Sequence, residues 1–259
     1  MKKILTLTAA VFAAAVLSAQ AKLKVGATPV PHAEMLNLVK DDLKAQGVDI
    51  QVIEMTDYVI LNDALESGEL DANFDQHIPY MESTNKEKGY HLVNAGGIHI
   101  EPIALYSKKV SKLSDLKKKA TIAIPNDPTN GGRALLLLQA AELIELKKDA
   151  GITATTLDIA KNPLKLKFKE LDAASIPRTL NDVDAAVING NYAIPAGLSA
   201  TKDGLFVEGK DSPYVNIIVV KDGNQNDPRV KALVKALQSD KIKNYISEKF
   251  KDGEVVAVF

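Results

Sequence analysis

The chain has 259 residues, of which 46% are hydrophobic and 25% are charged, a composition typical of one large globular domain or of two lobes. The formal net charge of −1 provides no basic surface of the kind that binds nucleic acid. The sequence contains no cysteine, which excludes disulfides and thiol chemistry.

The first 21 residues have the pattern of a secretory leader. Two lysines precede an apolar run at 4–17, and residues 19–21 form a small-x-small cleavage site. The alternative, a membrane anchor, requires a longer apolar run than this one. We therefore expect a signal peptide that is cleaved near Ala21. The mature protein is expected to be soluble in the periplasm, since no cysteine follows the leader to carry a lipid.

Hydrophobic periodicity predicts alternating strands and helices in the first part of the mature chain. Apolar residues alternate with polar ones in the strands and recur at helical spacing between them. The expected strands are 22–28, 49–55 and 70–74, and the expected helices are 31–46, 57–67 and 77–89. This order is typical of a doubly wound α/β fold with parallel strands.

A second set of elements begins near Ile98. The expected strands are 98–110, the end of 112–125, 166–170, 184–188 and 212–223. The expected helices are a short one after Lys112, then 129–147, 175–181 and those within 227–251. No repeat of fixed period is present, so the chain is not a repeat protein.

Two apolar segments next to prolines are predicted to cross between two lobes. These segments are 104–107 and 215–218. Lobe one then comprises 22–103 plus 219–259, and lobe two comprises 108–214. We therefore predict a two-lobed α/β protein with two interlobe crossing strands, in which a small ligand binds between the lobes.

The sequence lacks the motifs of several common enzyme classes. GxSxG, HExxH and GxxxxGK[ST] are all absent. The four histidines are His32, His77, His91 and His99. Their spacings do not match a zinc pattern. We therefore expect no enzyme, no metal site and no cofactor.

The stretch PNDPTNGGRALLLLQ, residues 125–139, joins the start of a helix to two glycines and an arginine. The helix N-terminus offers free N–H groups, and Gly131 and Gly132 allow a ligand to approach the backbone. Arg133 carries a planar fork that matches a carboxylate. An ordinary capped helix with a surface arginine explains the stretch equally well. Asn189 and Asn216 lie at the end of and within apolar strands, where a buried amide needs partners.

Five blocks resemble, in order, the NlpA lipoprotein family, the methionine-binding (MetQ-type) substrate-binding proteins of ABC transporters. The blocks are NDPTNGGRALLLLQ, DANFDQHIPYM, EPIALYSKKV, AVINGNYA and KDSPYVNIIV. The resemblance runs from about Lys24 to near the C-terminus. It implies a two-lobed periplasmic binding protein, type II-like, that delivers L-methionine to the permease and ATPase of an ABC importer. We expect it to act as a monomer.

The resemblance also implies roles for individual residues. Arg133 would hold the ligand carboxylate, and Asn189 and Asn216 would fix its carboxylate and ammonium groups. The pocket for the thioether side chain would be lined by Tyr58, Phe74, His77 and Tyr106, since sulfur makes favourable contacts with aromatic rings.

Two departures from the family pattern affect these expectations. The family usually carries a lipidated cysteine after its leader, and this chain has none. Relatives often have an aromatic or other apolar residue in place of Asp75. If Asp75 faces the cleft, it favours a ligand with an extra ammonium or amide; if it faces solvent, it changes nothing. The alternatives are therefore a methionine-containing dipeptide, another amino acid, or, in a different class, a metal-binding receptor.

Overall fold

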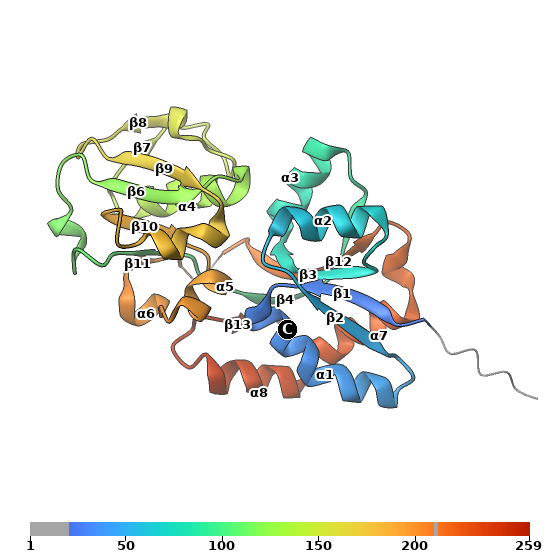
Figure 1. Ribbon diagram of the computed structural model, residues 1–259. Coiled ribbons are helices and arrows are strands. Elements are labelled where there is room, and N and C mark those ends of the chain that lie inside the picture. Colours follow the sequence, from blue (N-terminus) through green and yellow to red (C-terminus); the bar gives the residue numbers. More distant parts are fainter. Residues whose placement is uncertain (1–20, 210–211) are drawn as a thin grey trace, which may run out of the picture.

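The computed structural model describes residues 21–209 and 212–259, so the predicted signal peptide at 1–20 lies outside the described residues. The described chain forms two large sheets, each covered by helices, and one two-stranded sheet (Figure 1). This is the predicted two-lobed α/β architecture. Within the described ranges, no helix is both long and apolar enough to cross a membrane.

The first sheet has six strands in the order β13-β4-β12-β3-β1-β2. Their bounds are β1 Leu23–Ala27, β2 Ile50–Glu54, β3 Ala72–His77, β4 Leu92–Ile100, β12 Val215–Lys221 and β13 Val256–Ala257. β1 pairs in parallel with β2 and β3, whereas β12 runs antiparallel to both β3 and β4. The sheet is therefore mixed, and the prediction of a parallel sheet was wrong for β12 and β13, which run opposite to the other strands.

Helices cover both faces of this sheet (Figure 1). One face carries α1 Glu34–Ala45, α7 Pro228–Leu237 and α8 Asp240–Lys249, and the other carries α2 Tyr58–Ser67 and α3 Ile78–Lys88. β12 illustrates why both faces are buried: Ile218 and Val220 pack into the core under α1, while Ile217 and Val219 pack into the core under α2. Its apolar run is continuous because successive side chains point to opposite faces.

The second sheet has five strands in the order β11-β5-β10-β6-β9. Their bounds are β5 Ala104–Tyr106, β6 Thr121–Pro125, β9 Lys167–Leu171, β10 Ala185–Ile188 and β11 Gly204–Val207. This lobe also contains α4 Pro128–Ala140, α5 Gly190–Ala193, α6 Ala200–Asp203, several 3-10 helices of which the longest is Ala173–Thr179, and the strand pair β7 Glu145–Leu146 with β8 Ile159–Lys161. Helix α4 packs Leu135 and Leu138 against Ile122 and Ile124 of β6.

Three predicted elements differ in type or extent from the structure. The helix expected at 175–181 is a 3-10 helix, Ala173–Thr179. The helix expected at 129–147 ends at Ala140, because Glu142 adopts a positive φ of 58° that a helix does not contain. The strand expected at 98–110 is two strands, β4 and β5, which belong to different sheets and are separated at 101–103.

The predicted crossing segments lie inside the sheets. Residues 104–106 form β5, which pairs with β10 and β11, and residues 215–218 belong to β12, which pairs with β3 and β4. The chain passes from one sheet to the other just before each segment, at 101–103 and between Val207 and Val215. We refer to these as the first and second connections. The proline next to each segment lies in the connection itself, so it indicated the position of the connection correctly. The apolar residues that follow each proline belong to the strands β5 and β12.

Candidate functional site

A cavity lies between the two sheets and is lined by side chains from both. The lining residues are Tyr58, Asp75, Gln76, His77, Tyr80, Glu101, Asn130, Arg133, Asn189, Gly190, Asn191 and Asn216. The cavity is small, and the roughly 330 Å³ of atom-free space between these residues includes space that is open to solvent. The cavity brings together five of the predicted site residues, Arg133, Asn189, Asn216, Tyr58 and His77.

The structure places the other two predicted site residues, Phe74 and Tyr106, in the hydrophobic cores. Phe74 packs edge-on against His32, with ring centroids 4.6 Å apart, in the core of the first lobe. Tyr106 is 1% exposed in a core of the second lobe. Neither residue is among those that line the cavity. The side chain of β3 that reaches the cavity next to Phe74 is Asp75.

The two glycines before Arg133 serve packing within the second lobe. A Cβ on Gly132 would lie 2.2 Å from the carbonyl oxygen of Ile152, so this position requires glycine. The helix N-terminus is capped by the Asp127 side chain, which accepts from the backbone N–H of Asn130 at 2.8 Å. The interpretation of the glycines and the helix N-terminus as a ligand receptor was therefore wrong, because protein groups fill both positions.

Arg133 is buried and touches both connections between the sheets. Its Nε and Nη2 donate to Glu208 at 2.8 and 2.5 Å, and Nη2 also donates to the Glu101 carbonyl oxygen at 2.8 Å. Its guanidinium lies 4.2 Å from the centre of the Tyr214 ring. Glu101 belongs to the first connection, whereas Glu208 and Tyr214 belong to the second. The alternative of a surface arginine is excluded, since Arg133 is 3% exposed.

An amide network lies beside Arg133. Asn130 Oδ1 accepts from Asn189 Nδ2 at 2.7 Å and lies 3.1 Å from His77 Nε2. Burial and the nearby Arg133 charge lower the pKa of His77 to about 3, so this imidazole is neutral at pH 7 and Nε2–H can donate. These contacts hold Asn130, Asn189 and His77 in fixed orientations at the cavity wall.

Four polar atoms at the cavity are buried and have no hydrogen-bond partner within the part of the chain that the structure describes. They are both carboxyl oxygens of Asp75, Oδ1 of Asn189 and Nδ2 of Asn191. The Oδ1 atom of Asn191 accepts from the Tyr58 hydroxyl at 2.6 Å. Since buried polar atoms in folded proteins are nearly always paired, these atoms are the natural contacts for a polar ligand.

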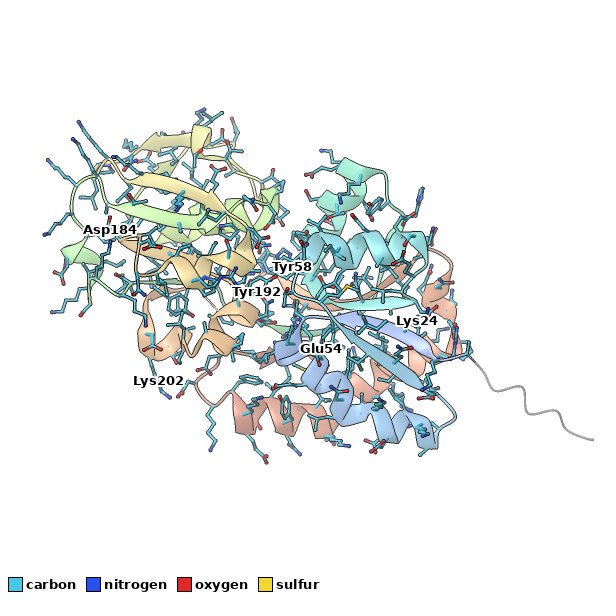
Figure 2. All side chains as sticks on the ribbon, in the orientation of Figure 1. Lys24, Glu54, Tyr58, Asp184, Tyr192 and Lys202 are labelled. Carbon is cyan, nitrogen blue, oxygen red and sulfur yellow. The ribbon has the colours of Figure 1, made fainter. Side chains whose placement is uncertain are left out.

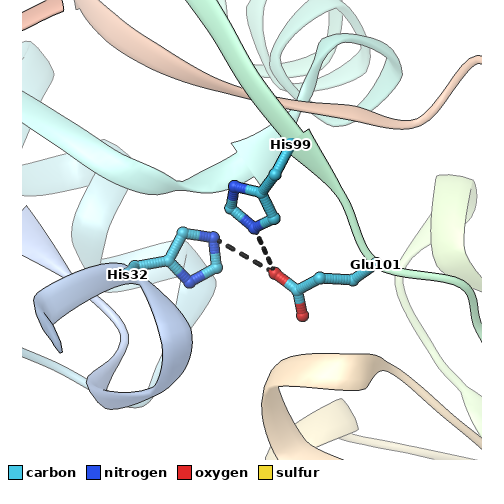
Figure 3. A group of neighbouring side chains, drawn as sticks. All are labelled: His32, His99 and Glu101. Atoms are coloured by element: carbon cyan, nitrogen blue, oxygen red, sulfur yellow. Dashed lines mark hydrogen bonds and ion pairs between the residues drawn. The ribbon is translucent and has the colours of Figure 1, made fainter. Parts of the chain in front are cut away.

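A second buried polar group lies behind the cavity and includes Glu101 (Figure 3). The Oε1 atom of Glu101 is 2.8 Å from His99 Nε2 and 3.4 Å from His32 Nε2. His32 Nδ1 in turn lies 2.7 Å from the hydroxyl of Thr28. Burial lowers the pKa of His32 to about 4 and that of His99 to about 3, so both rings are neutral at pH 7. His99 Nε2–H thus donates to Glu101 Oε1, whereas the hydrogen bond of His32 Nε2 is to Asn216 Oδ1 at 3.3 Å.

The same three side chains also have the composition of a metal site. Their candidate ligand atoms lie within 4.8 Å of one another. Hydrogen bonds to Thr28, Asn216 and Glu101 already satisfy three of the four ring nitrogens, which makes a hydrogen-bonded cluster the simpler description. His91 lies apart on the surface, where it contacts Glu66.

Sequence reasoning missed several cavity residues. Glu101 was detectable, because His99 and Glu101 are polar residues two apart in an otherwise apolar strand and therefore lie on one face. Glu208, which pairs with Arg133, gave no local signal. Asn130 lies in the stretch 125–139 but was not predicted as a site residue, and it joins His77 to Asn189.

Comparison with known proteins finds relatives that are named as lipoproteins. The chain is 45% identical over 231 residues to the membrane lipoprotein TpN32 of Treponema pallidum, covering 89% of this chain and 86% of that protein. It is 46% identical over 211 residues to the D-methionine-binding lipoprotein MetQ of Escherichia coli, covering 81% of this chain and 78% of that protein.

The fold has close relatives among solved structures. A nutrient-binding protein from Burkholderia cenocepacia, solved bound to methionine, superposes with a TM-score of 0.89 at 51% identity, covering 92% of this chain and all of that one. The sequence pattern of the NlpA lipoproteins matches residues 23–259, which include both sheets and the whole cavity. The chain belongs to the NlpA lipoprotein family.

Proposed function

We propose that this chain is a periplasmic substrate-binding protein that binds L-methionine and delivers it to the permease and ATPase of an ABC importer. The observation that carries the proposal is the set of unpartnered polar atoms, together with Arg133, around one small interlobe cavity. The names of the relatives in Escherichia coli and Burkholderia cenocepacia support methionine as the ligand.

The two ends of an amino acid fit different parts of the cavity wall. Arg133 supplies the positive charge for the carboxylate. Glu101 and the free Oδ1 of Asn189 accept from the ammonium, with Asn216 beside them. Tyr58, His77 and Tyr80 line the remainder of the cavity, where aromatic rings suit a thioether.

The proposal extends to the cellular setting. The mature protein is a periplasmic monomer released by cleavage near Ala21, and it diffuses freely because the chain has no cysteine to carry a lipid. It transforms no substrate. Lobe one, 22–103 plus 219–259, and lobe two, 108–214, close on the ligand by motion at the two connections.

Titration calorimetry tests the ligand assignment. The protein is unfolded, dialysed and refolded to remove any bound amino acid, and L-methionine is then titrated against it. We expect saturable heat with a Kd near 1 μM, about −8 kcal/mol, which is a moderate affinity for a buried ligand of this size. Absence of heat from L-methionine, with a correctly folded sample by circular dichroism, would remove methionine as the ligand.

A metal-binding receptor is the second candidate, favoured by the cluster of His32, His99 and Glu101. Equilibrium dialysis against Zn²⁺ with the wild type and a His99→Gln variant tests it. Stoichiometric Zn²⁺ that is lost in the variant would favour this candidate, whereas equal uptake by both proteins would count against it.

A further inference from the structure

Asp75 is the most isolated carboxyl group at the cavity. In the pairing of β3 with β12, Phe74 is opposite Ile218 and Gln76 is opposite Ile217, so Asp75 is the extra residue of a β-bulge. Its side chain lines the cavity while being only 3% exposed. Neither carboxyl oxygen has a hydrogen-bond partner within residues 21–209 and 212–259.

Two tyrosine side chains lie within electrostatic range of this carboxyl group. Tyr80 of α3 and Tyr192 of α5 are both near enough for the Asp75 charge to help raise the pKa of their hydroxyls. Tyr58 of α2 packs between these two rings, with centroid distances of 5.7 Å to Tyr80 and 5.1 Å to Tyr192. Figure 2 shows Tyr58 and Tyr192 meeting where the two lobes face each other.

The tyrosines and His77 near Asp75 are uncharged at pH 7, and Arg133 and Glu101 line the same cavity. Burial raises the pKa values of the Tyr58, Tyr80 and Tyr192 hydroxyls. His77, two residues after Asp75 in β3, has its pKa lowered to about 3. Burial alone raises the pKa of Asp75 well above its usual range, with no basic side chain among the described residues to offset it. An isolated carboxylate in such a place is unfavourable unless it binds a proton or a cation.

We propose that Asp75 binds a positively charged group at the end of a linear amino-acid side chain, so that this receptor accepts cationic amino acids as well as methionine. This rests on the proposed function, in which Arg133 and Glu101 hold the α-carboxylate and α-ammonium. A cation between Asp75 and the tyrosine rings gains an ion pair and favourable contact with the ring faces. The thioether of methionine offers no N–H and no charge, so Asp75 keeps its proton when methionine binds.

The ligand comparison uses S-methyl-L-methionine, which has the methionine skeleton plus one methyl group and one positive charge, and L-lysine as a second cationic probe. Ligand-stripped wild type and an Asp75→Asn variant, which has nearly the same shape without the charge, are titrated with each and with L-methionine. We expect the variant to lose about 10- to 100-fold in affinity for both cations, which corresponds to about 1.4–2.7 kcal/mol for the loss of the opposite charge, and to retain its affinity for L-methionine.

Proton release provides a readout that a purely structural role of Asp75 would not change. Binding of a cation by the wild type should release about one proton, seen as a dependence of the heat on the buffer's ionisation enthalpy, because Asp75 ionises to form the pair. Binding of L-methionine should release none, and Asp75→Asn should release none with any ligand. Affinity of the wild type for cations should rise with pH as Asp75 loses its proton more easily.

The outcomes separate this inference from the proposed function. Wild type that binds L-methionine but neither cation overturns the role of Asp75 and leaves the methionine assignment intact. Wild type that binds the cations but not L-methionine supports Asp75 and overturns the methionine assignment. Equal losses for all ligands in Asp75→Asn would also overturn the inference, since they would show only a structural effect.

Discussion

Replacement of Arg133 by alanine should destabilise the ligand-free protein and weaken ligand binding. Arg133 makes two hydrogen bonds to the Glu208 carboxylate and one to the Glu101 carbonyl oxygen. The side chains of Arg133 and Glu208 are only 4% and 15% exposed, so the substitution leaves a mostly buried carboxylate without its partner. Removal of one partner from a buried pair costs about 3–5 kcal/mol, and the partial exposure of Glu208 favours the lower end, about 3 kcal/mol.

A double-mutant cycle measured by urea unfolding separates the pair from the rest of the substitution. The proteins are wild type, Arg133→Ala, Glu208→Gln and the double variant, with Arg178→Ala as a control for loss of an exposed arginine. We expect a coupling energy of about 1–3 kcal/mol between the two sites, because the double variant no longer contains an unpaired charge. The control should change the free energy of unfolding by less than about 0.5 kcal/mol.

Binding to the same variants shows whether Arg133 also serves the ligand. Arg133→Ala should lose about 10-fold or more in affinity for the amino acid, since a charge-assisted hydrogen bond is worth roughly 1.5–3 kcal/mol. Glu208→Gln should bind more tightly than wild type, because the ligand carboxylate no longer competes with Glu208 for the guanidinium. Arg133→Ala with unchanged unfolding and unchanged affinity would refute the reasoning on both points.

Three further predictions concern packing, acid sensitivity and the ammonium end of the ligand. Gly132→Ala should destabilise the protein by about 1–3 kcal/mol in urea unfolding, since the added Cβ would meet the Ile152 carbonyl oxygen. Gly131→Ala should cost less, because the nearest atom to its added Cβ is 3.0 Å away. Equal losses of stability in the two variants would contradict this explanation. Between pH 7 and pH 5 the buried His32, His77 and His99 bind protons in the unfolded chain but not in the folded chain, so the free energy of unfolding should fall by roughly 2 kcal/mol for each of them. A His91→Gln variant should keep the same acid sensitivity. A urea midpoint that does not change with pH would exclude buried neutral rings. Glu101→Gln should reduce calorimetric affinity about 10-fold with little change in the affinity of an analogue that lacks the α-ammonium, and a loss that is equal for both ligands would argue against an ammonium contact.

The sequence was sufficient for the architecture because hydrophobic periodicity is local. The continuous apolar run of β12 and the helical spacing in α1 each depend only on neighbouring residues, and both elements were found. The direction of β12 was not predictable in this way. An antiparallel strand that enters from a distant part of the chain has the same apolar pattern as a parallel one.

The sequence predicted cavity residues correctly at positions where a polar residue stands next to an apolar run. Arg133 and Asn189 are polar residues next to apolar runs, and both line the cavity. Phe74 was misplaced because the β-bulge in β3 turns Asp75 to the cavity, and a bulge depends on the partner strand, which the local pattern does not show. Gly132 was misread for a similar reason, since the segment that occupies its open side is about 20 residues away in the sequence.

The position of Arg133 connects the proposed binding event to the proposed lobe motion. Arg133 contacts the first connection through the Glu101 carbonyl oxygen and the second connection through Glu208 and Tyr214. A zwitterionic ligand brings one carboxylate and one ammonium, so it leaves the net charge of the cavity unchanged while it competes with Glu208 for the guanidinium. A ligand carboxylate that accepts a hydrogen bond from the Arg133 guanidinium in place of Glu208 therefore alters a contact to the second connection. Because a ligand shifts a conformational equilibrium only through contacts that differ between the two states, the exchange at Arg133 provides such a difference at the place where the lobes are joined.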